Sequence, residues 1–157
     1  MPPAAAGEKA GLRAWHFVLG WLNTAAGHIP QVTSKWQMRD YLWAGMVRLG
    51  FGRDHYRISP GLYALGQPDT KSPVVVTCNF KLTFDILRRE LSGHSFWVLV
   101  VETYGINVWC AAGKKSFSTE EVARRVKKSD LDRVVSHRTL ILPQFAEPAV
   151  AALRPLK

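Results

Sequence analysis

The chain has 157 residues, and 47% of them are hydrophobic, which excludes a disordered polypeptide and allows one domain with a core. Its two cysteines make no disulfide framework, and its five histidines have no zinc-ligand spacing, so we expect a cytoplasmic protein. The net charge of +9 suggests an anionic ligand, an acidic protein or an anionic membrane surface, although a merely solvated basic surface is about as common. No apolar run reaches the roughly 18 residues of a membrane span, and no nucleic-acid reading module is recognisable.

The N-terminal part of the chain is expected to be extended. Residues 1–34 form a lead-in and an arm in this prediction, because they begin with a Pro-, Ala- and Gly-rich stretch and continue with aromatic residues between turn signals. Residues 14–34 are expected to run irregularly across the rest of the molecule. Residues 35–157 are predicted to form an α/β domain. The aromatic residues that alternate as in a strand, or that could instead fill a groove, are Trp15, Phe17 and Trp21.

The first helix is predicted over residues 36–49, with Ser34 as a possible cap and Gly50 after its end. Large apolar side chains recur in it at helical intervals, and we expect them to pack in the core. A short extended piece follows at residues 56–58. The apolar residues of the helix are Trp36, Tyr41, Leu42, Met46 and Leu49.

A strand, a helix and a second strand follow in the middle of the chain. Residues 73–77 form a continuous β-branched run, typical of a buried parallel strand, and residues 96–101 are predicted to be the second buried strand. Between them, residues 81–91 show a helical pattern, with Arg88 and Arg89 expected to point outward. This order predicts a parallel β-α-β unit.

The last elements complete the predicted sheet. A helix begins at Ser118, which forms a capping box with Glu121, and short strands are predicted at residues 134–135 and 140–142. Ligands of such sheets bind beyond the carboxyl ends of the strands. We therefore expect the residues after each strand, including Ser136-His137-Arg138, to meet at one edge.

Residues 107–114 (NVWCAAGK) lie after the second buried strand and are predicted to form a very short helix. Asn107 is a good N-cap, and Gly113 is a natural end. Cys110 then occupies the third helical position, where the helix dipole favours a thiolate. The small side chains around the sulfur would allow a flat, wide ligand to lie close to it.

This segment resembles the cap-helix signature of the corrinoid protein of the mercury-methylation pair (HgcA family), and the resemblance extends over roughly residues 20–150. It implies a Rossmann-like open, mostly parallel sheet with helices on both faces and a short cap helix. It also implies that Cys110 is the lower axial ligand of the cobalt in cobalamin or a related corrinoid. The implied cofactor-binding residues of the cap helix are Asn107, Val108, Trp109, Cys110, Ala111, Ala112, Gly113 and Lys114.

By this resemblance the protein is a corrinoid-dependent methyltransferase that transfers a methyl group from cobalt to inorganic Hg(II) and forms methylmercury. The implied partners are a ferredoxin-like [4Fe–4S] protein, a methyl-folate-type donor and Hg(II). Family members continue into a C-terminal membrane region, at the cytoplasmic face of the inner membrane, and this chain is expected to lack it. A thiol-based redox enzyme that uses Cys110, and a non-catalytic basic binding module, remain as alternatives.

Three further residues are candidates for contact with the corrinoid. Thr77 and Asn79 lie at the carboxyl end of a buried strand, where polar side chains can reach a ligand or make local turn bonds. His137 is a candidate partner for the tail of the cofactor or a polar residue in a turn. Cys78, which ends the same strand as Thr77, is expected to be a buried packing residue.

Overall fold

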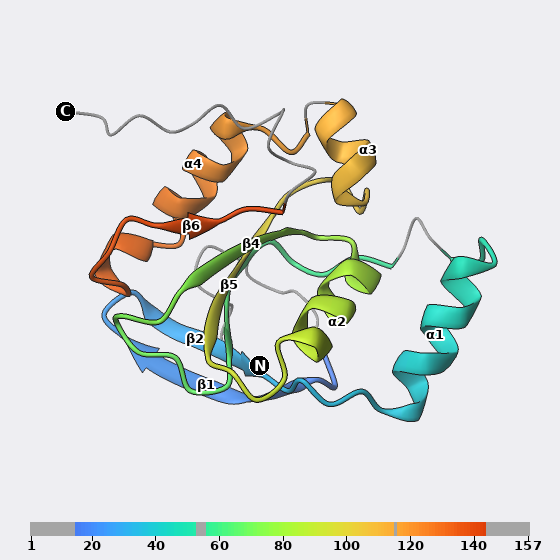
Figure 1. Cartoon of the computed structure of the whole chain (residues 1–157), viewed down its shortest axis with the longest axis horizontal. Coiled ribbons are helices and arrows are strands. Elements are labelled where there is room, and N and C mark those ends of the chain that lie inside the picture. Colours follow the sequence, from blue (N-terminus) through green and yellow to red (C-terminus); the bar gives the residue numbers. More distant parts are fainter. Residues whose placement is uncertain (1–14, 53–55, 115, 144–157) are drawn as a thin grey trace.

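The computed structural model describes residues 15–52, 56–114 and 116–143 (Figure 1). Within them the strands are β1 (Val18–Thr24), β2 (Gly27–Val32), β3 (Gly61–Leu65), β4 (Val74–Cys78), β5 (Phe96–Val101) and β6 (Leu140–Ile141). The helices are α1 (Met38–Arg48), α2 (Lys81–Glu90), α3 (Val108–Gly113), α4 (Thr119–Lys128) and the 3₁₀ turn η2 (Leu131–Arg133). In the described part of the chain, no helix is both long enough and apolar enough to cross a bilayer.

The strands form one six-stranded open sheet in the order β1-β2-β3-β5-β4-β6. Parallel pairings join β2 to β3, β5 to β4 and β4 to β6, whereas β1–β2 and β3–β5 are antiparallel. The predicted α/β fold with a mostly parallel sheet is therefore confirmed in a mixed form. The central strands β4 and β5 are the two strands that were predicted to be buried, and they are buried on both faces.

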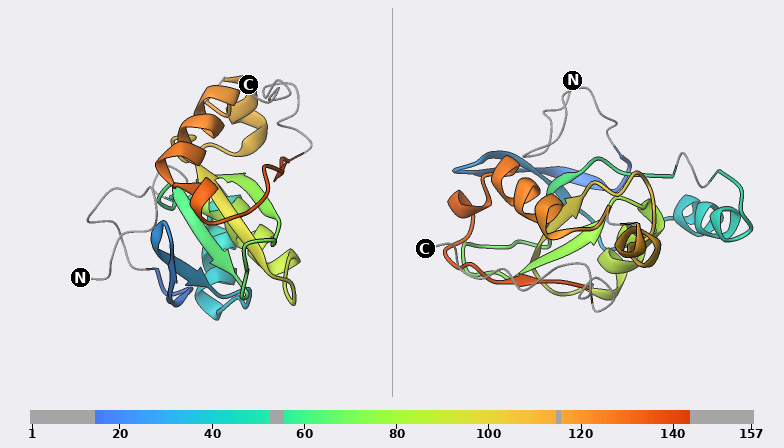
Figure 2. Two further views of the ribbon diagram at one scale, coloured as in Figure 1. Left: turned by 90° about the vertical axis from the view of Figure 1, so that its left-hand side faces the viewer. Right: turned by 90° about the horizontal axis from the view of Figure 1, so that it is seen from above.

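Helices cover both faces of the sheet, as predicted (Figure 2). Alternate residues of β5 point to opposite sides, so Val98 packs in the same cluster as Phe84 of α2. Leu99 packs in the other cluster with Val122 of α4. The two helices therefore bury their apolar stripes against the two faces of the same pair of strands.

Three elements differ from the sequence-based expectations. Residues 18–32 form the β1–β2 hairpin, which adds two strands to the sheet where an irregular arm was expected. Strand β3 was not predicted, and it pairs with β5 along its whole length. Val134 and Val135 directly follow η2 and are not a strand, because both of their backbone amides donate to the Leu131 carbonyl oxygen at 3.0 Å. The rest of the predicted lead-in, residues 1–14, lies outside the described residues.

Helix α1 forms where it was predicted, but the expected core packing is wrong. Only Asp40, Ala44 and Val47 of this helix are buried. Of the predicted apolar residues, Trp36 is partly buried and donates to the Asp85 carbonyl oxygen, whereas the other four, Tyr41, Leu42, Met46 and Leu49, are exposed. The reason is that α1 is joined to the domain by charges. Asp40 Oδ2 lies 3.1 Å from Nη2 of Arg88 on α2.

Arg88 is fully buried, so its predicted outward orientation is wrong. Its Nε donates to Asp85 Oδ1 at 2.9 Å, and its Nη1 donates to the carbonyl oxygens of Thr33 and Lys35 at 2.8 and 3.1 Å. Paired charges and backbone acceptors offset the cost of burying this guanidinium.

Candidate functional site

The cap helix α3 starts where the sequence indicates. The carbonyl oxygen of Asn107 accepts the first helical hydrogen bond, from the amide of Ala111 at 2.9 Å. Cys110 is therefore the third residue of the helix, and its own carbonyl oxygen accepts from the amide of Lys114 at 3.0 Å. The helix ends at Gly113, as predicted.

The described side chains of α3 divide between two sides. Val108 and Ala111 are buried in the core, whereas Cys110 carries a free thiol and is exposed, as are Asn107 and Lys114. The spacing of three and four residues places these exposed side chains on one face of the helix. Ala111 therefore does not contribute its side chain to a flat outer surface, which corrects that expectation. The side chains of Trp109 and Ala112 lie outside the described ones.

A tight loop links β5 to α3. Tyr104 and Gly105 both have positive φ angles, of 58° and 73°, and a Cβ at position 105 would lie 3.4 Å from the side chain of Arg57. Asn79 Oδ1 accepts three hydrogen bonds that fix this turn: from the Thr103 amide at 3.2 Å, the Thr103 hydroxyl at 2.8 Å and the Gly105 amide at 2.9 Å. The unusual backbone is thus held by a buried side chain from the neighbouring strand.

The carboxylates of Glu102 and Glu121 extend this network to α4. Asn79 Nδ2 donates to Glu102 Oε1 at 2.7 Å, and the same oxygen accepts from the amide of Tyr104 at 2.7 Å. The amide of Glu102 donates in turn to Glu121 Oε1 at 2.9 Å. Sequence reasoning missed the role of Glu102, Thr103 and Glu121, although polar residues directly after a buried strand are a signal that could have indicated the first two.

The candidates at the end of β4 lie beside the cap helix, but their side chains are buried. Thr77 is 2% exposed and Asn79 is 1% exposed, and the amide of Asn79 is used by the loop. Cys78 is fully buried in the core, which confirms its burial. Burial raises the pKa of the Cys78 thiol, and hydrogen bonds from the amides of Phe80 and Val108 oppose that shift in part.

His137 lies at the other end of the sheet, which corrects the expected common edge. It precedes β6, and β6 runs parallel to β4 with Leu140 opposite Val74, so the residue is near the start of β4. At about 3.3 Å per residue, the rise from Val74 to Asn79 alone is about 16 Å, so His137 lies farther than this from Asn79. Its Nε2 lies 2.9 Å from the Ser72 carbonyl oxygen, and its Nδ1 accepts from the Thr139 amide at 3.3 Å.

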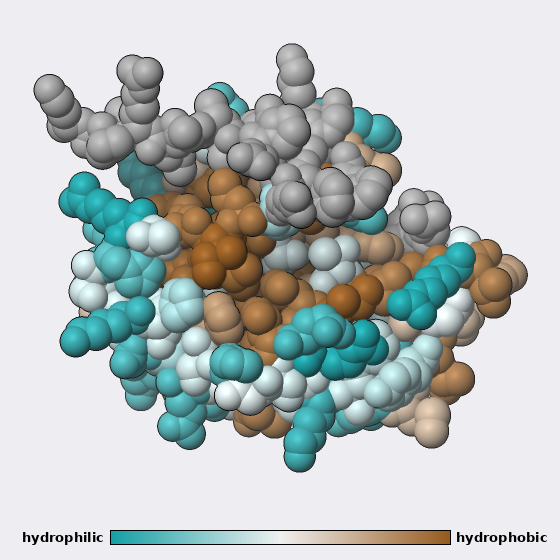
Figure 3. Space-filling view, in the orientation of Figure 1, coloured by the Kyte–Doolittle hydropathy of each residue, from teal (hydrophilic) through white to brown (hydrophobic). Residues whose placement is uncertain are grey.

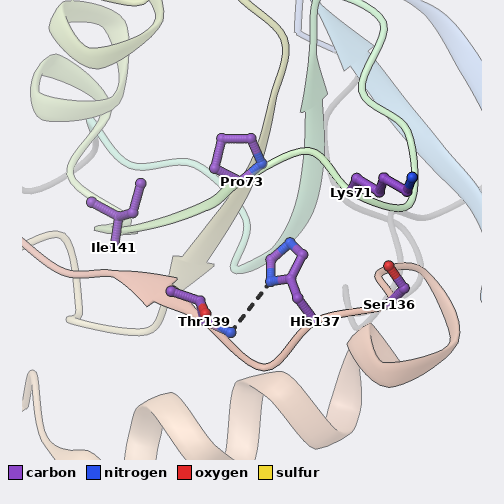
Figure 4. Close-up of a pocket in the computed structure, with 6 residues that line it drawn as sticks. All are labelled: Lys71, Pro73, Ser136, His137, Thr139 and Ile141. Carbon is purple, nitrogen blue, oxygen red and sulfur yellow. Dashed lines mark hydrogen bonds between the residues drawn. The ribbon is translucent and has the colours of Figure 1, made fainter.

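The surface around His137 is an open pocket (Figure 4). Both ring nitrogens of His137 have protein partners there, so the residue is the polar member of a turn. Nowhere in the described ranges do three or more His, Cys, Asp or Glu side chains gather as a metal site would require. The pocket is lined by Lys71, Pro73, Ser136, His137, Thr139 and Ile141.

The family of the chain follows from its match to a family model. Residues 52–154 match the model of the CO dehydrogenase/acetyl-CoA synthase delta subunit (CdhD). The chain belongs to this family. The matched region holds β3 to β6 and α2 to α4, and with them Asn79, the β5–α3 loop and Cys110. The hairpin β1–β2 and helix α1 precede it.

Curated relatives of this delta-subunit family member are gamma subunits of the acetyl-CoA decarbonylase/synthase complex. The subunit from Methanopyrus kandleri is 36% identical over 93 residues, which is 58% of this chain and 20% of the relative. Gamma subunit 2 from Methanosarcina thermophila is 39% identical over 89 residues, 54% of this chain and 19% of the relative. The subunit from Methanocaldococcus jannaschii is 34% identical over 91 residues, which is 57% of this chain and 19% of the relative. The chain thus spans about a fifth of the length of the curated relatives it matches.

Proposed function

We propose that this chain is the corrinoid-binding domain of a methyl carrier, with Cys110 as the lower axial ligand of cobalt. One observation carries the proposal: the cap helix presents a free, exposed thiol at its third position while its other side is anchored in the core. A catalytic thiol needs access to a small substrate, but it does not need a whole helix face around it. Membership of the delta-subunit family, and the resemblance of residues 107–114 to the mercury-methylation signature, support the same assignment.

The residues present fit such a cofactor in their donor chemistry. A thiolate is a soft ligand, and an axial ligand tunes what the metal can do. Asn107 and Lys114 share the exposed face of Cys110, where they can hold amide or phosphate groups at the edge of a corrinoid. A bound corrinoid would supply a cobalt that accepts and releases a methyl group. The protein contributes the sulfur, its orientation and the rigid loop behind it.

For Thr77 and Asn79 we propose a supporting role in place of direct contact. Both side chains are buried, and the Asn79 amide holds the turn that leads into the helix. Thr77 lies on the face of β4 opposite to Val76 and Cys78, which pack in the same cluster as Val108 and Ala111 of α3. Val108 and Ala111 fix the height of the helix above the sheet by packing beneath it.

The methyl acceptor is the finer part of the proposal. The contiguous mercury-methylation segment supports inorganic Hg(II), a soft acceptor, with methylmercury as the product. The curated relatives are named for acetyl-CoA synthesis and cleavage, so the alternative is a methyl carrier in that chemistry. A ferredoxin-like [4Fe–4S] reductant, a methyl-folate donor and a cytoplasmic location belong to the same proposal.

Reconstitution with hydroxocobalamin tests the cofactor. We expect a visible spectrum with a sulfur-to-cobalt band in the wild type and in Cys78→Ala, and a water-ligated spectrum in Cys110→Ala. Identical spectra for Cys110→Ala and the wild type would overturn the ligand assignment. Incubation of the methylcobalamin-loaded protein with Hg(II) then tests the acceptor, since methylmercury should form in the wild type and fall sharply in Cys110→Ala.

The free exposed thiol also favours a second candidate, a thiol-based redox enzyme. Its second cysteine, Cys78, is buried with a raised pKa, which is unfavourable for a resolving thiol. Peroxide consumption without any spectral change on addition of cobalamin would favour this candidate.

A further inference from the structure

Helix α1 presents large apolar side chains to solvent. We call Met38, Leu42, Met46 and Leu49 the apolar ridge, and their exposed fractions are 75%, 63%, 45% and 77%. Phe51, just beyond the helix, is 63% exposed. Single exposed apolar residues are ordinary, but a contiguous patch of this kind marks an interaction site.

The ridge lies on the side of α1 opposite the domain. At 100° per residue, Met38, Leu42, Met46 and Leu49 fall within one sector, and the buried residues of the helix fall about 180° away. Figures 1 and 2 show α1 standing out at one end of the molecule, and Figure 3 shows hydrophobic surface there. An ordinary surface helix has the reverse arrangement, with its apolar stripe toward the core.

Among the described residues 35–52, the exposed charged side chains are all positive. Lys35, Arg39 and Arg48 are exposed, whereas Asp40, the acid of this helix, is buried against Arg88. The helical wheel places Arg39 on one flank of the ridge and Arg48 on the other.

An aromatic ring stands on each flank as well. Tyr41 makes an edge contact with Trp36 at 4.9 Å, and Trp43 stacks on Tyr56 at 5.8 Å. Both rings remain about half exposed, at 55% for Tyr41 and 46% for Trp43. Each flank of the apolar ridge therefore carries an arginine and an amphipathic ring. This arrangement is typical of a helix that lies in the plane of a bilayer interface.

The flanking charges decide between possible occupants. A second copy of the chain would bring its own arginines against these, so like charges would oppose self-association. An anionic bilayer would place negative headgroups beside both flanks of the ridge, where they can meet Arg39 and Arg48. A groove in a partner protein would not require an arginine on each flank. The family match begins at residue 52, so the shared methyl-carrier core does not account for α1.

We propose that α1 docks this chain onto an anionic lipid bilayer, with the apolar ridge inserted among the acyl chains and Arg39 and Arg48 at the headgroups. Docking of this kind is peripheral and needs no membrane-spanning segment.

Vesicle sedimentation tests the proposal with phosphatidylcholine vesicles and with vesicles containing about 30% phosphatidylglycerol. We expect the wild type to bind the anionic vesicles and to bind the neutral ones much more weakly. The double variant Leu42→Ser/Leu49→Ser should lose about tenfold in partitioning for each leucine. Arg39→Gln and Arg48→Gln should each lose about fivefold, since each cation near such a surface contributes about that factor. Leu19→Ser, at a residue 68% exposed on β1, is the matched control and should bind like the wild type.

Two results would overturn the proposal. Binding that Leu42→Ser/Leu49→Ser leaves unchanged would show attraction by charge elsewhere on the chain. A wild type that stays in solution with both vesicles would exclude the bilayer; light scattering would then assign the ridge to self-association if the protein is dimeric, or to a protein groove if it is monomeric.

Discussion

The side-chain oxygen of Asn79 accepts a hydrogen bond from the backbone amide of Gly105 at 2.9 Å, and it thereby joins the end of β4 to the turn before the cap helix. The same oxygen serves two donors of Thr103. A buried acceptor with three donors is costly to remove, because each orphaned group loses its hydration without compensation. The position of Cys110 consequently depends on a residue that does not touch the exposed face of α3.

Asn79→Ala should lower the free energy of unfolding by at least about 2 kcal/mol, since buried donors lose their acceptor. It should also weaken the sulfur-to-cobalt band of the cobalamin-loaded protein, because the turn no longer fixes the helix. Urea unfolding and visible spectra measure the two effects. Asn23→Ala, at an exposed position of β1, is the control and should change neither.

The two thiols should differ strongly in reactivity. Cys110 is exposed, whereas Cys78 is fully buried and burial raises its pKa. Alkylation of the native protein near neutral pH should therefore modify Cys110 faster by at least about tenfold, because Cys78 reacts only after local opening. Peptide mapping after a timed reaction measures both rates, and Cys110→Ser isolates the slow one. Comparable rates would contradict the burial of Cys78.

The parts of the fold that sequence reasoning found are those with a strong local signal. Strand β4 is a largely β-branched run and β5 is a continuous apolar run. Helix α4 follows a serine whose hydroxyl accepts from the Glu121 amide. The cap segment is marked by its own N-cap residue and terminal glycine. Because a contiguous motif can be recognised from neighbouring residues alone, the sequence indicates Cys110 as a candidate site residue without knowledge of the fold.

The parts of the fold that sequence reasoning missed depend on contacts with residues far away in the chain. Strand β3 forms backbone hydrogen bonds with β5, which lies more than thirty residues away in the chain. The residues of β3 alone therefore do not indicate a strand. The sequence predicts His137 at the wrong edge because the pattern indicates a strand at the buried pair Val134-Val135, whereas the structure has the turn after η2 there. Arg88 was expected outside because arginine rarely lies in a core unless charges such as Asp40 and Asp85 surround it.

Leucine substitutions at two positions of the cap segment should separate its two sides. Ala111→Leu places extra volume in the core and should cost about 1–3 kcal/mol of stability. Lys114→Leu changes an exposed residue and should alter stability by less than about 0.5 kcal/mol. If the ligand lies on the exposed face, Lys114→Leu should nevertheless weaken cobalamin binding in a titration. Equal stability of Ala111→Leu and the wild type would contradict the burial of Ala111.

Acid should weaken the attachment of α1 through Asp40. Burial alone would raise the pKa of this carboxyl, but the hydrogen bond from the Gln37 amide, the charge of Arg88, the hydrogen bond with His16 and the charge of Lys81 together hold it below the ordinary value of 3.8. Since the pKa is lower in the folded state, the carboxylate stabilises the protein fully above that ordinary value, and this contribution is lost as the pH falls through the folded-state pKa.

Asp40→Asn should therefore destabilise the protein at neutral pH by about 3–5 kcal/mol, because Arg88 and Lys81 stay buried without one of their counterions. The variant should also lose the part of the acid dependence that appears below about pH 4, where Asp40 becomes protonated in the wild type. Urea unfolding across pH values from about 3 to 7 measures both effects, with the exposed Asp132→Asn as the control. Equal slopes of stability against pH below about 4 in the variant and the wild type would mean that α1 is held by its few buried apolar contacts, Ala44 and Val47, and not by the charge of Asp40.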